Sequence, residues 1–449
     1  MLTTCFDKMK IFMIIILIIG FFLRIYKLGA QSLWIDEVIT INTAQMTPMA
    51  IISAHKSATI IHPSLFYILV HYWSYLGKSE FVLRLLSVLL GTYTIYLFFL
   101  LGKLLFNKNV GALSALILSI SPFHIWYSQE IRPYALMILL SIIVVLFFLK
   151  IIKQNYWVFY LGYILTTVVG FYIHFYIILE IIFINLFLIL TWKQHKYLLL
   201  KWIPCQIIIV LLYLPWVFVL LHAVEVRPCL RDIGLMVFPY TFFAFSAGFS
   251  LGPSIAELHV YNSIYQFLPY LWILVLFTII FVIIFIIGLI SLGEDKERLI
   301  FLLLYIGIPI LGAFLISQYS NNVTYNVRYV CMSLPAYYLI LAKGIYSIKR
   351  KGYMISLILL VILCNSFSLN NYYFNEKYAK EDSRSVTKYI ETNAISNDVI
   401  LITSPSLMVP FNYYYSGCLQ KYSFTANQIF INSKTSKKAK QQLQKYRRI

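Results

Sequence analysis

Long runs of apolar residues, separated by short polar segments, dominate the pattern of the chain. About 20 such residues form an α-helix long enough to cross the hydrocarbon core of a bilayer. Eleven runs of this kind occur, over residues 11–28, 82–102, 110–127, 134–152, 156–173, 175–192, 202–221, 267–290, 299–317, 329–347 and 353–369. The pattern predicts an all-α polytopic membrane protein with about eleven transmembrane helices.

The stretch from His62 to Gly77 interrupts this pattern. It is short for a membrane span, and it mixes His71 and Ser74 with Trp and Tyr side chains. Residues of these kinds gather at the membrane–water interface. We therefore predict a helix that lies on the membrane surface, facing outward.

The first apolar run, over residues 11–28, has no clear small-residue cleavage site after it, so we predict an uncleaved span.

The Lys and Arg residues give the orientation. With eleven spans and a cytoplasmic N-terminus, every cytoplasmic loop is basic, as the positive-inside rule requires. These loops contain Lys103/Lys108, Lys150/Lys153, Lys193/Lys196/Lys201, Lys296/Arg298 and Lys349/Arg350/Lys351. The sequence thus predicts a multi-pass membrane protein whose other loops face outside, and the lack of organelle signals favours the cytoplasmic membrane.

Composition agrees with this class. The 449 residues are 61% hydrophobic and only 12% charged, whereas a soluble protein has about a quarter charged residues. A net charge of +19 would suit nucleic-acid binding, but Lys and Arg are spread over short loops and one tail. That distribution indicates topology and contact with anionic lipid, and no nucleic-acid partner is predicted. The six cysteines have no metal-binding spacing, which favours free thiols and leaves a pairing of Cys229 with Cys418 open.

The last part of the chain, from about residue 371, lacks the long apolar runs. Residues 380–392 have the spacing of an amphipathic helix, and residues 398–403 that of a buried strand. A basic segment follows, from Ser433 to Arg448. We predict two domains, a transmembrane catalytic domain over 1–370 and a small α/β domain over 371–449 on the outer face.

Two groups of charged residues fall in the predicted outer loops. Asp36 and Glu37 are adjacent, and such a pair can supply one ionised base and one partner that forms a hydrogen bond or binds a metal. Acids at a helix N-terminus would give the same pattern. Glu130 and Arg132 lie in a short turn between two spans. They either pair with each other or with lipid headgroups, or they have functional roles, in which Glu130 joins the first carboxylates and Arg132 binds an anionic ligand.

Three further candidates lie on the same predicted face. Arg328 opens the tenth span, where a lipid phosphate would sit, although an arginine there can also snorkel. His174 lies at an outer turn among aromatic residues, and His62 begins the surface helix. Phosphate-binding loops, the serine elbow and the zinc-protease helix are missing from the sequence. If the protein is a transferase, the absence of a nucleotide-binding motif favours a donor activated by a lipid phosphate rather than by a nucleotide.

Several motifs, taken in order, resemble a known family. They are Arg24-x-Tyr26-x-Leu28, Leu33-Trp34-Ile35-Asp36-Glu37, His62-Pro63-Ser64-Leu65-Phe66-Tyr67, Glu80-Phe81-x-x-Arg84-Leu85, Ser121-Pro122-Phe123-His124-x-x-Tyr127-Ser128-Gln129-Glu130-x-Arg132-x-Tyr134, Asn326-x-Arg328-Tyr329 and Lys380-Glu381-Asp382-x-Arg384. Together they resemble the GT-C glycosyltransferases, in the bacterial branch related to the dolichyl-phosphate-mannose–protein mannosyltransferases (family 39-like). Ser64 and Pro133 depart from the family pattern, where Pro and Met are more usual, but neither removes a proposed chemical group.

The resemblance implies an inverting sugar transfer from a polyprenyl-phosphate donor to an acceptor hydroxyl on the outer face. It assigns the general base to Asp36 and the leaving phosphate to Arg132 and Arg328. Glu37 and Glu130 would orient the acceptor, Arg132 or a metal. His62 and His174 would contact substrate or a metal. No cofactor is assigned, and a divalent metal is left open, as are the sugar and the choice of lipid, glycan or protein as acceptor.

Two other classes share some of these features. A lipid-linked saccharide polymerase or ligase would use a long late outer loop, and residues 222–266 form one with His222, Glu225, Arg227, Arg231, Asp232 and His259. A flippase or other transporter of lipid-linked saccharide would place polar residues at the middle of the membrane. The early Trp-x-Asp-Glu segment favours the transferase. A purely structural membrane protein is a third alternative.

Overall fold

The computed structural model describes residues 2–56, 63–221, 234–254, 257, 264–319, 324–396, 398–402 and 404–423. These residues are mostly helical. The chain divides into two compact units, one formed by Met1–Gly29 with Thr43–Ala379 and the other by Ala30–Asn42 with Lys380–Ile449. Each unit is built from segments that lie far apart in the sequence.

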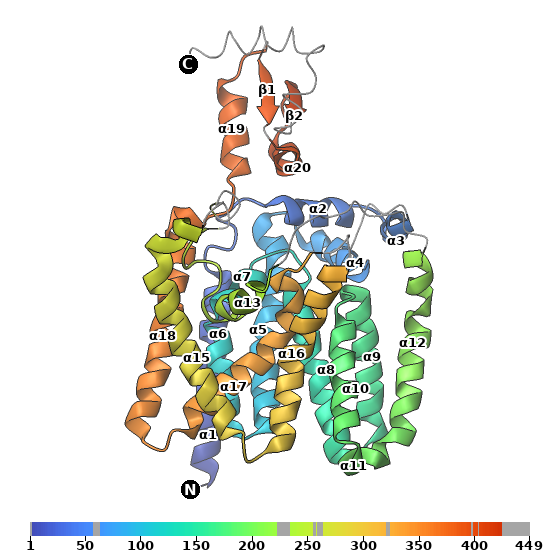
Figure 1. Ribbon diagram of the computed structural model, residues 1–449. Helices are drawn as coiled ribbons and strands as arrows, with labels where there is room; N and C mark the ends of the chain where they lie inside the picture. Colours follow the sequence, from blue (N-terminus) through green and yellow to red (C-terminus); the bar gives the residue numbers. More distant parts are fainter. Residues whose placement is uncertain are drawn as a thin grey trace. The chain divides into compact units, whose positions relative to one another are not determined.

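The first unit is a helical bundle (Figure 1). Its α-helices are α1 (Leu2–Ile25), α3 (Pro48–Lys56), α4 (Leu65–Trp73), α5 (Glu80–Leu105), α6 (Lys108–Ser119), α7 (Pro122–Ser128), α8 (Tyr134–Gln154), α9 (Trp157–Ile173), α10 (Ile177–Leu190), α11 (Trp192–His195), α12 (Leu199–Leu221), α13 (Val237–Ala247), α15 (Leu271–Ser291), α16 (Lys296–Tyr319), α17 (Leu334–Ser347) and α18 (Lys351–Phe374). Short 3₁₀ helices complete it: η1 (Ser74–Leu76), η2 (Lys196–Leu198), η3 (Ile264–Tyr270), η4 (Val327–Ser333) and η5 (Glu376–Tyr378).

Within the described part of the chain, six helices are long and apolar enough to cross a membrane, or seven if α6 and α7 form one bent span. The chain is therefore a membrane protein. Helices also cover the other predicted apolar runs, but several are shorter than a full span. For example, α9 has 17 residues and α10 has 14.

Two predicted spans are irregular. The run over 110–127 is bent by 62° between α6 and α7. Pro122 has no N–H to continue the helix, and Ser121 caps the new one, because its hydroxyl accepts a hydrogen bond from the His124 amide at 3.1 Å. The run over 329–347 begins as the 3₁₀ helix η4 and becomes α-helical only at Leu334.

The predicted surface segment is helical but short. Helix α4 has nine residues, so it is about 14 Å long at 1.5 Å per residue. This is less than half of the ~30 Å hydrocarbon core, which agrees with a segment that does not span. Its predicted first residue, His62, lies outside the described residues.

Glycines allow two helix pairs of the bundle to approach closely. A Cβ atom added to Gly102 of α5 would lie 2.7 Å from the Cα of Gly111 in α6. One added to Gly344 of α17 would lie 2.7 Å from the backbone nitrogen of Gly288 in α15. Any side chain at these positions would push the helices apart. Small residues serve this purpose in membrane bundles, where dispersion contacts between backbones hold helices together.

The connections that carry the basic clusters lie at one end of the bundle. The turn at α11 and the start of α1 lie there, whereas α4, α7 and α13 lie toward the opposite end (Figure 1). The basic connections and α7 therefore lie toward opposite ends of the bundle.

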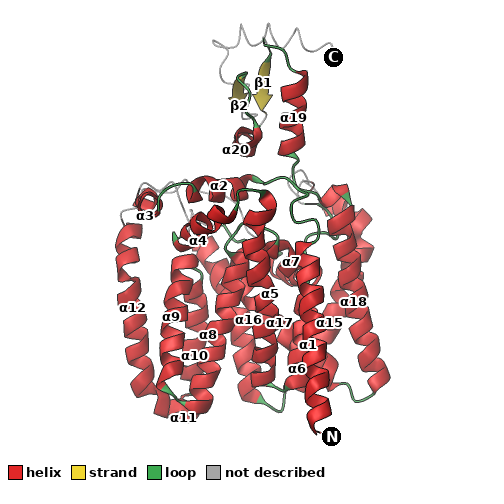
Figure 2. Cartoon of the chain, turned by 180° about the vertical axis from the view of Figure 1, so that it is seen from behind, coloured by secondary structure: helices red, strands yellow, loops and turns green. Residues whose placement is uncertain are grey.

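The second unit contains two strands and helices from both ends of the chain. Its elements are α2 (Ile35–Ala44), α19 (Ser383–Asn393), β1 (Val399–Ile402), α20 (Pro405–Tyr414) and β2 (Gln420–Ser423). The strands pair in parallel, with Val399 opposite Gln420 and Ile402 opposite Ser423 (Figure 2). Ile400, Ile402, Phe411 and Tyr415 form its buried core. The helix and the strand that the sequence predicts after residue 380 are both present.

Candidate functional site

The turn between α7 and α8 carries two buried charges. Helix α7 ends at Ser128, and α8 begins at Tyr134 after Pro133. Between them, Glu130 is 2% exposed and Arg132 is 4% exposed. Long charged side chains are rarely buried this completely unless they have partners or a function. The short turn thus holds a buried carboxylate and a buried guanidinium.

Two guanidinium groups flank one aromatic ring. The Cζ atom of Arg132 lies 5.7 Å from the ring centre of Tyr134, and the Cζ atom of Arg328 lies at the same distance from that ring. Arg328 comes from η4, and the side chain of the N-cap residue Asn326 accepts a hydrogen bond from the Arg328 amide at 3.2 Å. Cation–π contacts of this kind orient arginine side chains. The fold therefore brings together two arginines almost 200 residues apart in the sequence.

His174 joins the same cluster from the turn between α9 and α10. Its ring centre lies 6.2 Å from that of Tyr134 and 5.5 Å from that of Tyr329. Its Nδ1 atom accepts a hydrogen bond from the Tyr176 amide at 3.3 Å. Burial, with the nearby charges of Arg132 and Arg328, lowers the pKa of His174 to about 3. At neutral pH the imidazole is uncharged.

The cluster has the chemistry of an anion site. The charges of Glu130 and Arg328 both act on the buried Tyr127 hydroxyl, so Glu130 belongs to the cluster as well. Arginine forks bind phosphate through paired hydrogen bonds, and such bonds strengthen where water is excluded. Two guanidiniums beside one aromatic ring could bind an anionic ligand and stabilise negative charge on it.

Gln129 fixes the start of this turn. Its side-chain Nε2 donates to the carbonyl oxygens of Arg24 and Tyr26, at 2.8 and 2.9 Å, at the end of α1. Its Oε1 accepts from the Tyr372 hydroxyl of α18 at 2.6 Å. One side chain thus joins three helices. The sequence contains Gln129 within its Gln-Glu-x-Arg motif but gives no sign of this structural role.

The adjacent carboxylates of the second unit have different surroundings. Both lie in the first turn of α2. Glu37 is fully buried, whereas Asp36 is half-buried. The ammonium of Lys380 lies 3.6 Å from Oε2 of Glu37, and it also lies 5.6 Å from the ring centre of Trp34. Glu37 therefore has a cationic neighbour inside the unit, and Asp36 is the more accessible carboxylate.

Further contacts attach the segment before α2 to the start of α19. The Ser32 hydroxyl donates to Oδ1 of Asp382 at 2.6 Å, and Nη2 of Arg384 donates to the Ala30 carbonyl at 2.6 Å. The hydrogen bonds from Ser32 and Ser385 lower the pKa of Asp382. These contacts explain why the Lys-Glu-Asp-x-Arg motif accompanies the Trp-x-Asp-Glu motif. The sequence contains both motifs, but nothing in it shows that they are in contact.

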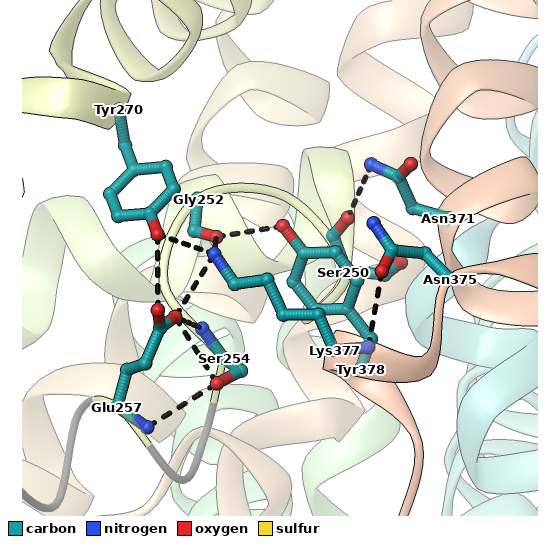
Figure 3. A network of polar contacts seen from close by, with 9 residues as sticks. All are labelled: Ser250, Gly252, Ser254, Glu257, Tyr270, Asn371, Asn375, Lys377 and Tyr378. Carbon is teal, nitrogen blue, oxygen red and sulfur yellow. Dashed lines mark hydrogen bonds and ion pairs between the residues drawn. The ribbon is translucent and has the colours of Figure 1, made fainter.

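A network at the end of α18 holds one residue of the long loop after α13 (Figure 3). Oε2 of Glu257 lies 3.0 Å from Nζ of Lys377, and Oε1 accepts from the Tyr270 hydroxyl at 3.1 Å. The Ser254 amide donates to the same carboxylate at 2.7 Å. Desolvation raises the pKa of Glu257, but the hydrogen bonds from Ser254, Lys377 and Tyr270 outweigh it and lower the pKa to about 2. Glu257 is not among the loop residues named from the sequence, and those six (His222, Glu225, Arg227, Arg231, Asp232 and His259) lie outside the described residues.

A further carboxyl is buried among the helices. Glu180 of α10 is fully buried, and its Oε1 accepts from the Ser141 hydroxyl of α8 at 2.8 Å. The Tyr305 hydroxyl of α16 lies 2.8 Å from that of Ser141. Sequence reasoning misses this cluster, because one acid in a long apolar run leaves the hydropathy signal intact.

Metal ligands do not cluster in the part of the chain that is described: no group of three or more His, Cys, Asp or Glu side chains there could hold an ion. His62 lies outside that part, and so does Cys229, whose pairing with Cys418 the sequence leaves open. The sulfur of Cys418 is a free thiol.

Comparison with known proteins agrees with this architecture. Residues 61–219 match the model of the family described as dolichyl-phosphate-mannose-protein mannosyltransferase. No sequence among the curated proteins matches the chain. Among solved structures, ArnT from Cupriavidus metallidurans in the apo state is 11% identical with a TM-score of 0.59, and the match covers 97% of this chain and 89% of ArnT.

Two other solved structures have the same fold. ArnT bound to undecaprenyl phosphate is 12% identical with a TM-score of 0.55, over 94% of this chain and 87% of that one. The Archaeoglobus fulgidus oligosaccharyltransferase in complex with Zn and sulfate is 11% identical with a TM-score of 0.57, over 93% of this chain and 62% of that one.

The fold and the family match point in the same direction. Residues 61–219 of this chain resemble the dolichyl-phosphate-mannose-protein mannosyltransferase family, and the chain shares its fold with ArnT and the archaeal oligosaccharyltransferase, in agreement with the resemblance of its motifs.

Proposed function

We propose that this protein is an inverting glycosyltransferase that takes its sugar from a polyprenyl-phosphate donor. The observation that carries the proposal is the placement of Arg132 and Arg328 on one aromatic ring, beside Glu130 and His174. The buried guanidinium of Arg132 and the half-buried one of Arg328 suit the phosphate that would become the leaving group. The related fold supports this ligand class. One ArnT structure is bound to undecaprenyl phosphate, and one structure of the Archaeoglobus fulgidus oligosaccharyltransferase AglB is in complex with a dolichol-phosphate.

The proposed reaction breaks one bond and forms another at the anomeric carbon. The acceptor oxygen attacks from the face opposite the phosphate, and its proton passes to the carboxylate of Asp36. The bond between the anomeric carbon and the phosphate oxygen breaks, so the polyprenyl phosphate leaves with both bonding electrons. General-base assistance of this kind contributes roughly 10²–10⁴-fold. Arg132 and Arg328 would neutralise the leaving phosphate, while neutral His174 would contact the sugar or phosphate as a hydrogen-bonding group.

The proposed arrangement in the membrane follows the charge pattern. We place eleven spans over residues 1–370, with the basic connections in the cytoplasm and the cluster of Arg132 and Arg328 at the outer face of a cytoplasmic membrane. Residues 371–449 would form the outer domain. The position of α7 at the end of the bundle away from the basic turns supports this orientation. The acceptor would be a lipid, glycan or protein hydroxyl, and a divalent metal would be a further ligand if His62 or His174 binds one.

One buried group favours a second candidate, the transport of lipid-linked saccharide. Glu180 lies among apolar helices with Ser141 and Tyr305, and acids in membrane spans often mark transport pathways. Transport and transfer give different products, so one assay can separate them.

The test is turnover in reconstituted liposomes. Wild-type protein and Asp36→Asn would receive a panel of polyprenyl-phosphate monosaccharides with candidate acceptors, and release of free polyprenyl phosphate would be followed. Release by the wild type that disappears in Asp36→Asn would support the transferase. Movement of intact lipid-linked sugar across the bilayer, without release of free lipid phosphate, would instead establish the transporter.

A further inference from the structure

The break between α6 and α7 lies inside the protein, where Leu118, Ser119 and Ser121 are fully buried. The last four carbonyls of an α-helix have no partner within that helix, and a buried carbonyl without a partner is costly. At the end of α6 the Ile120 amide bonds to the Leu116 carbonyl at 3.3 Å. The Leu118 carbonyl accepts from the Ser121 amide at 3.3 Å and from Nη2 of Arg24 at 3.0 Å, and the Ser119 carbonyl accepts from Nη1 of Arg24 at 2.9 Å. A cation at this position is also favoured by the helix dipole.

The same guanidinium holds the beginning of α7. Nη2 of Arg24 lies 2.7 Å from Nδ1 of His124, and both side chains are fully buried. Because a guanidinium only donates hydrogen bonds, Nδ1 must accept, and His124 is therefore neutral with its proton on Nε2. Arg24 thus bridges the two helices that meet at the 62° bend.

The backbone of Arg24 holds the other end of α7. Its carbonyl oxygen accepts from Nε2 of Gln129 at 2.8 Å, directly after α7 ends at Ser128. One residue of α1 therefore contacts α7 at both ends, through its side chain and through its main chain. Glu130 and Arg132 follow within three residues of Gln129, so their position depends on this double contact.

We propose that Arg24 is a positioning residue for the phosphate-binding turn: it clamps α7 and thereby sets the position of Arg132. The inference rests on the proposed function, since it concerns how the donor phosphate is bound. Arg24 itself touches helix carbonyls and His124, not the cluster around Tyr134. If Arg24 acts in this way, removing Arg24 and removing Arg132 should weaken the same interaction, the binding of the donor phosphate.

A matched control is available at the same end of α1. Arg84 of α5 is also buried, at 2% exposed, and its Nη1 donates to the Leu28 carbonyl at 2.9 Å. It supports the segment that leaves α1. Arg84→Gln therefore removes a buried arginine of the same bundle without removing the clamp on α7.

The experiment is a double-mutant cycle read out by binding of undecaprenyl phosphate, without sugar, to purified protein. We expect Arg24→Gln to weaken binding by about tenfold, within the range of coupled neighbours, and Arg24→Gln/Arg132→Ala to bind no worse than Arg132→Ala alone. Arg84→Gln should leave binding near wild type, and its effect should add to that of Arg132→Ala. The clamp would be overturned if Arg24→Gln bound the lipid phosphate as tightly as wild type. It would also be overturned if the double variant bound more weakly than Arg132→Ala by the whole factor that Arg24→Gln loses on its own.

A second readout needs no ligand. Hydrogen exchange of residues 122–133 should accelerate in Arg24→Gln and not in Arg84→Gln, and Arg24→Lys should restore part of the protection. If Arg24→Gln does not fold, Gln129→Leu opens the other end of the clamp and should give the same results. Wild-type protein that binds no lipid phosphate would count against the proposed function, whereas unchanged exchange in both Arg24→Gln and Gln129→Leu would refute the clamp itself.

Discussion

The ammonium of Lys380 lies 3.6 Å from the carboxylate of Glu37, although the two residues are near opposite ends of the chain. Glu37 is fully buried, and burying a lone carboxylate is costly. Lys380 offsets that cost and ties the segment before α2 to the segment before α19. The two adjacent acids thus separate in role: Glu37 stabilises the second unit, and half-buried Asp36 remains the proposed base.

The pairing predicts a strong effect of removing the ammonium. Lys380→Met would leave the Glu37 charge buried beside a hydrocarbon chain, and we expect a loss of roughly 3 kcal/mol in the stability of the second unit. Hydrogen exchange of residues 30–42 and 380–402 would measure it. Glu37→Gln/Lys380→Met should lose less than the sum of the two single variants. Additive losses would mean that the two groups do not interact.

A second prediction separates the two acids by activity. Asp36→Asn should abolish sugar transfer, because an amide cannot take the proton of the acceptor, and its thermal stability should stay near wild type. Glu37→Gln should lower stability and retain measurable transfer. Comparison of melting temperature with turnover for the two variants checks both statements. If Asp36→Asn unfolds at a much lower temperature than wild type, Asp36 is structural.

A third prediction concerns the donor phosphate. Arg328→Ala should weaken binding of undecaprenyl phosphate by about 10- to 100-fold, the effect of one lost hydrogen bond to a charged group. Arg350→Ala is the matched control: its guanidinium also lies over a tyrosine, 5.9 Å from the ring centre of Tyr353, but in a basic connection between helices. Equal affinity for Arg328→Ala and wild type would remove Arg328 from the site.

Sequence reasoning places the main parts of the site for a physical reason. Apolar runs set the number of chain reversals, so Glu130, Arg132, His174 and Arg328 are all predicted at the same side of the bundle. The structure does gather these four residues. Periodicity and charge are sufficient here because a helix that crosses hydrocarbon must deliver its two ends to opposite faces.

The contacts that hold the site could not be predicted in the same way. The partner of Glu37 is one of many lysines, and only the tertiary fold selects Lys380. Arg24 looks like the basic end of a first span, whereas it binds carbonyls exposed by the bend at Ser121-Pro122. The proline signals a break, but not which distant side chain satisfies it. Glu180 is likewise hidden inside an apolar run.

The last prediction uses the network of Glu257 and Lys377. Its contacts lower the pKa of Glu257 from the ordinary 4.5 to about 2. A group with a lowered pKa in the folded state stabilises that state above its ordinary pKa, and the contribution disappears as the pH falls through the lowered value. The difference in melting temperature between wild type and Glu257→Gln should therefore be largest above pH 4.5 and should vanish as the pH approaches 2.

Glu376→Gln, which changes an exposed carboxylate next to Lys377, is the control and should show a smaller difference at every pH. Since both variants remove one carboxylate, the general effect of net charge is the same in each. A difference for Glu257→Gln that stays constant between pH 6 and pH 3 would mean that the carboxylate is not held by Lys377 and Tyr270 in the folded protein, and that the loop after α13 is attached in another way.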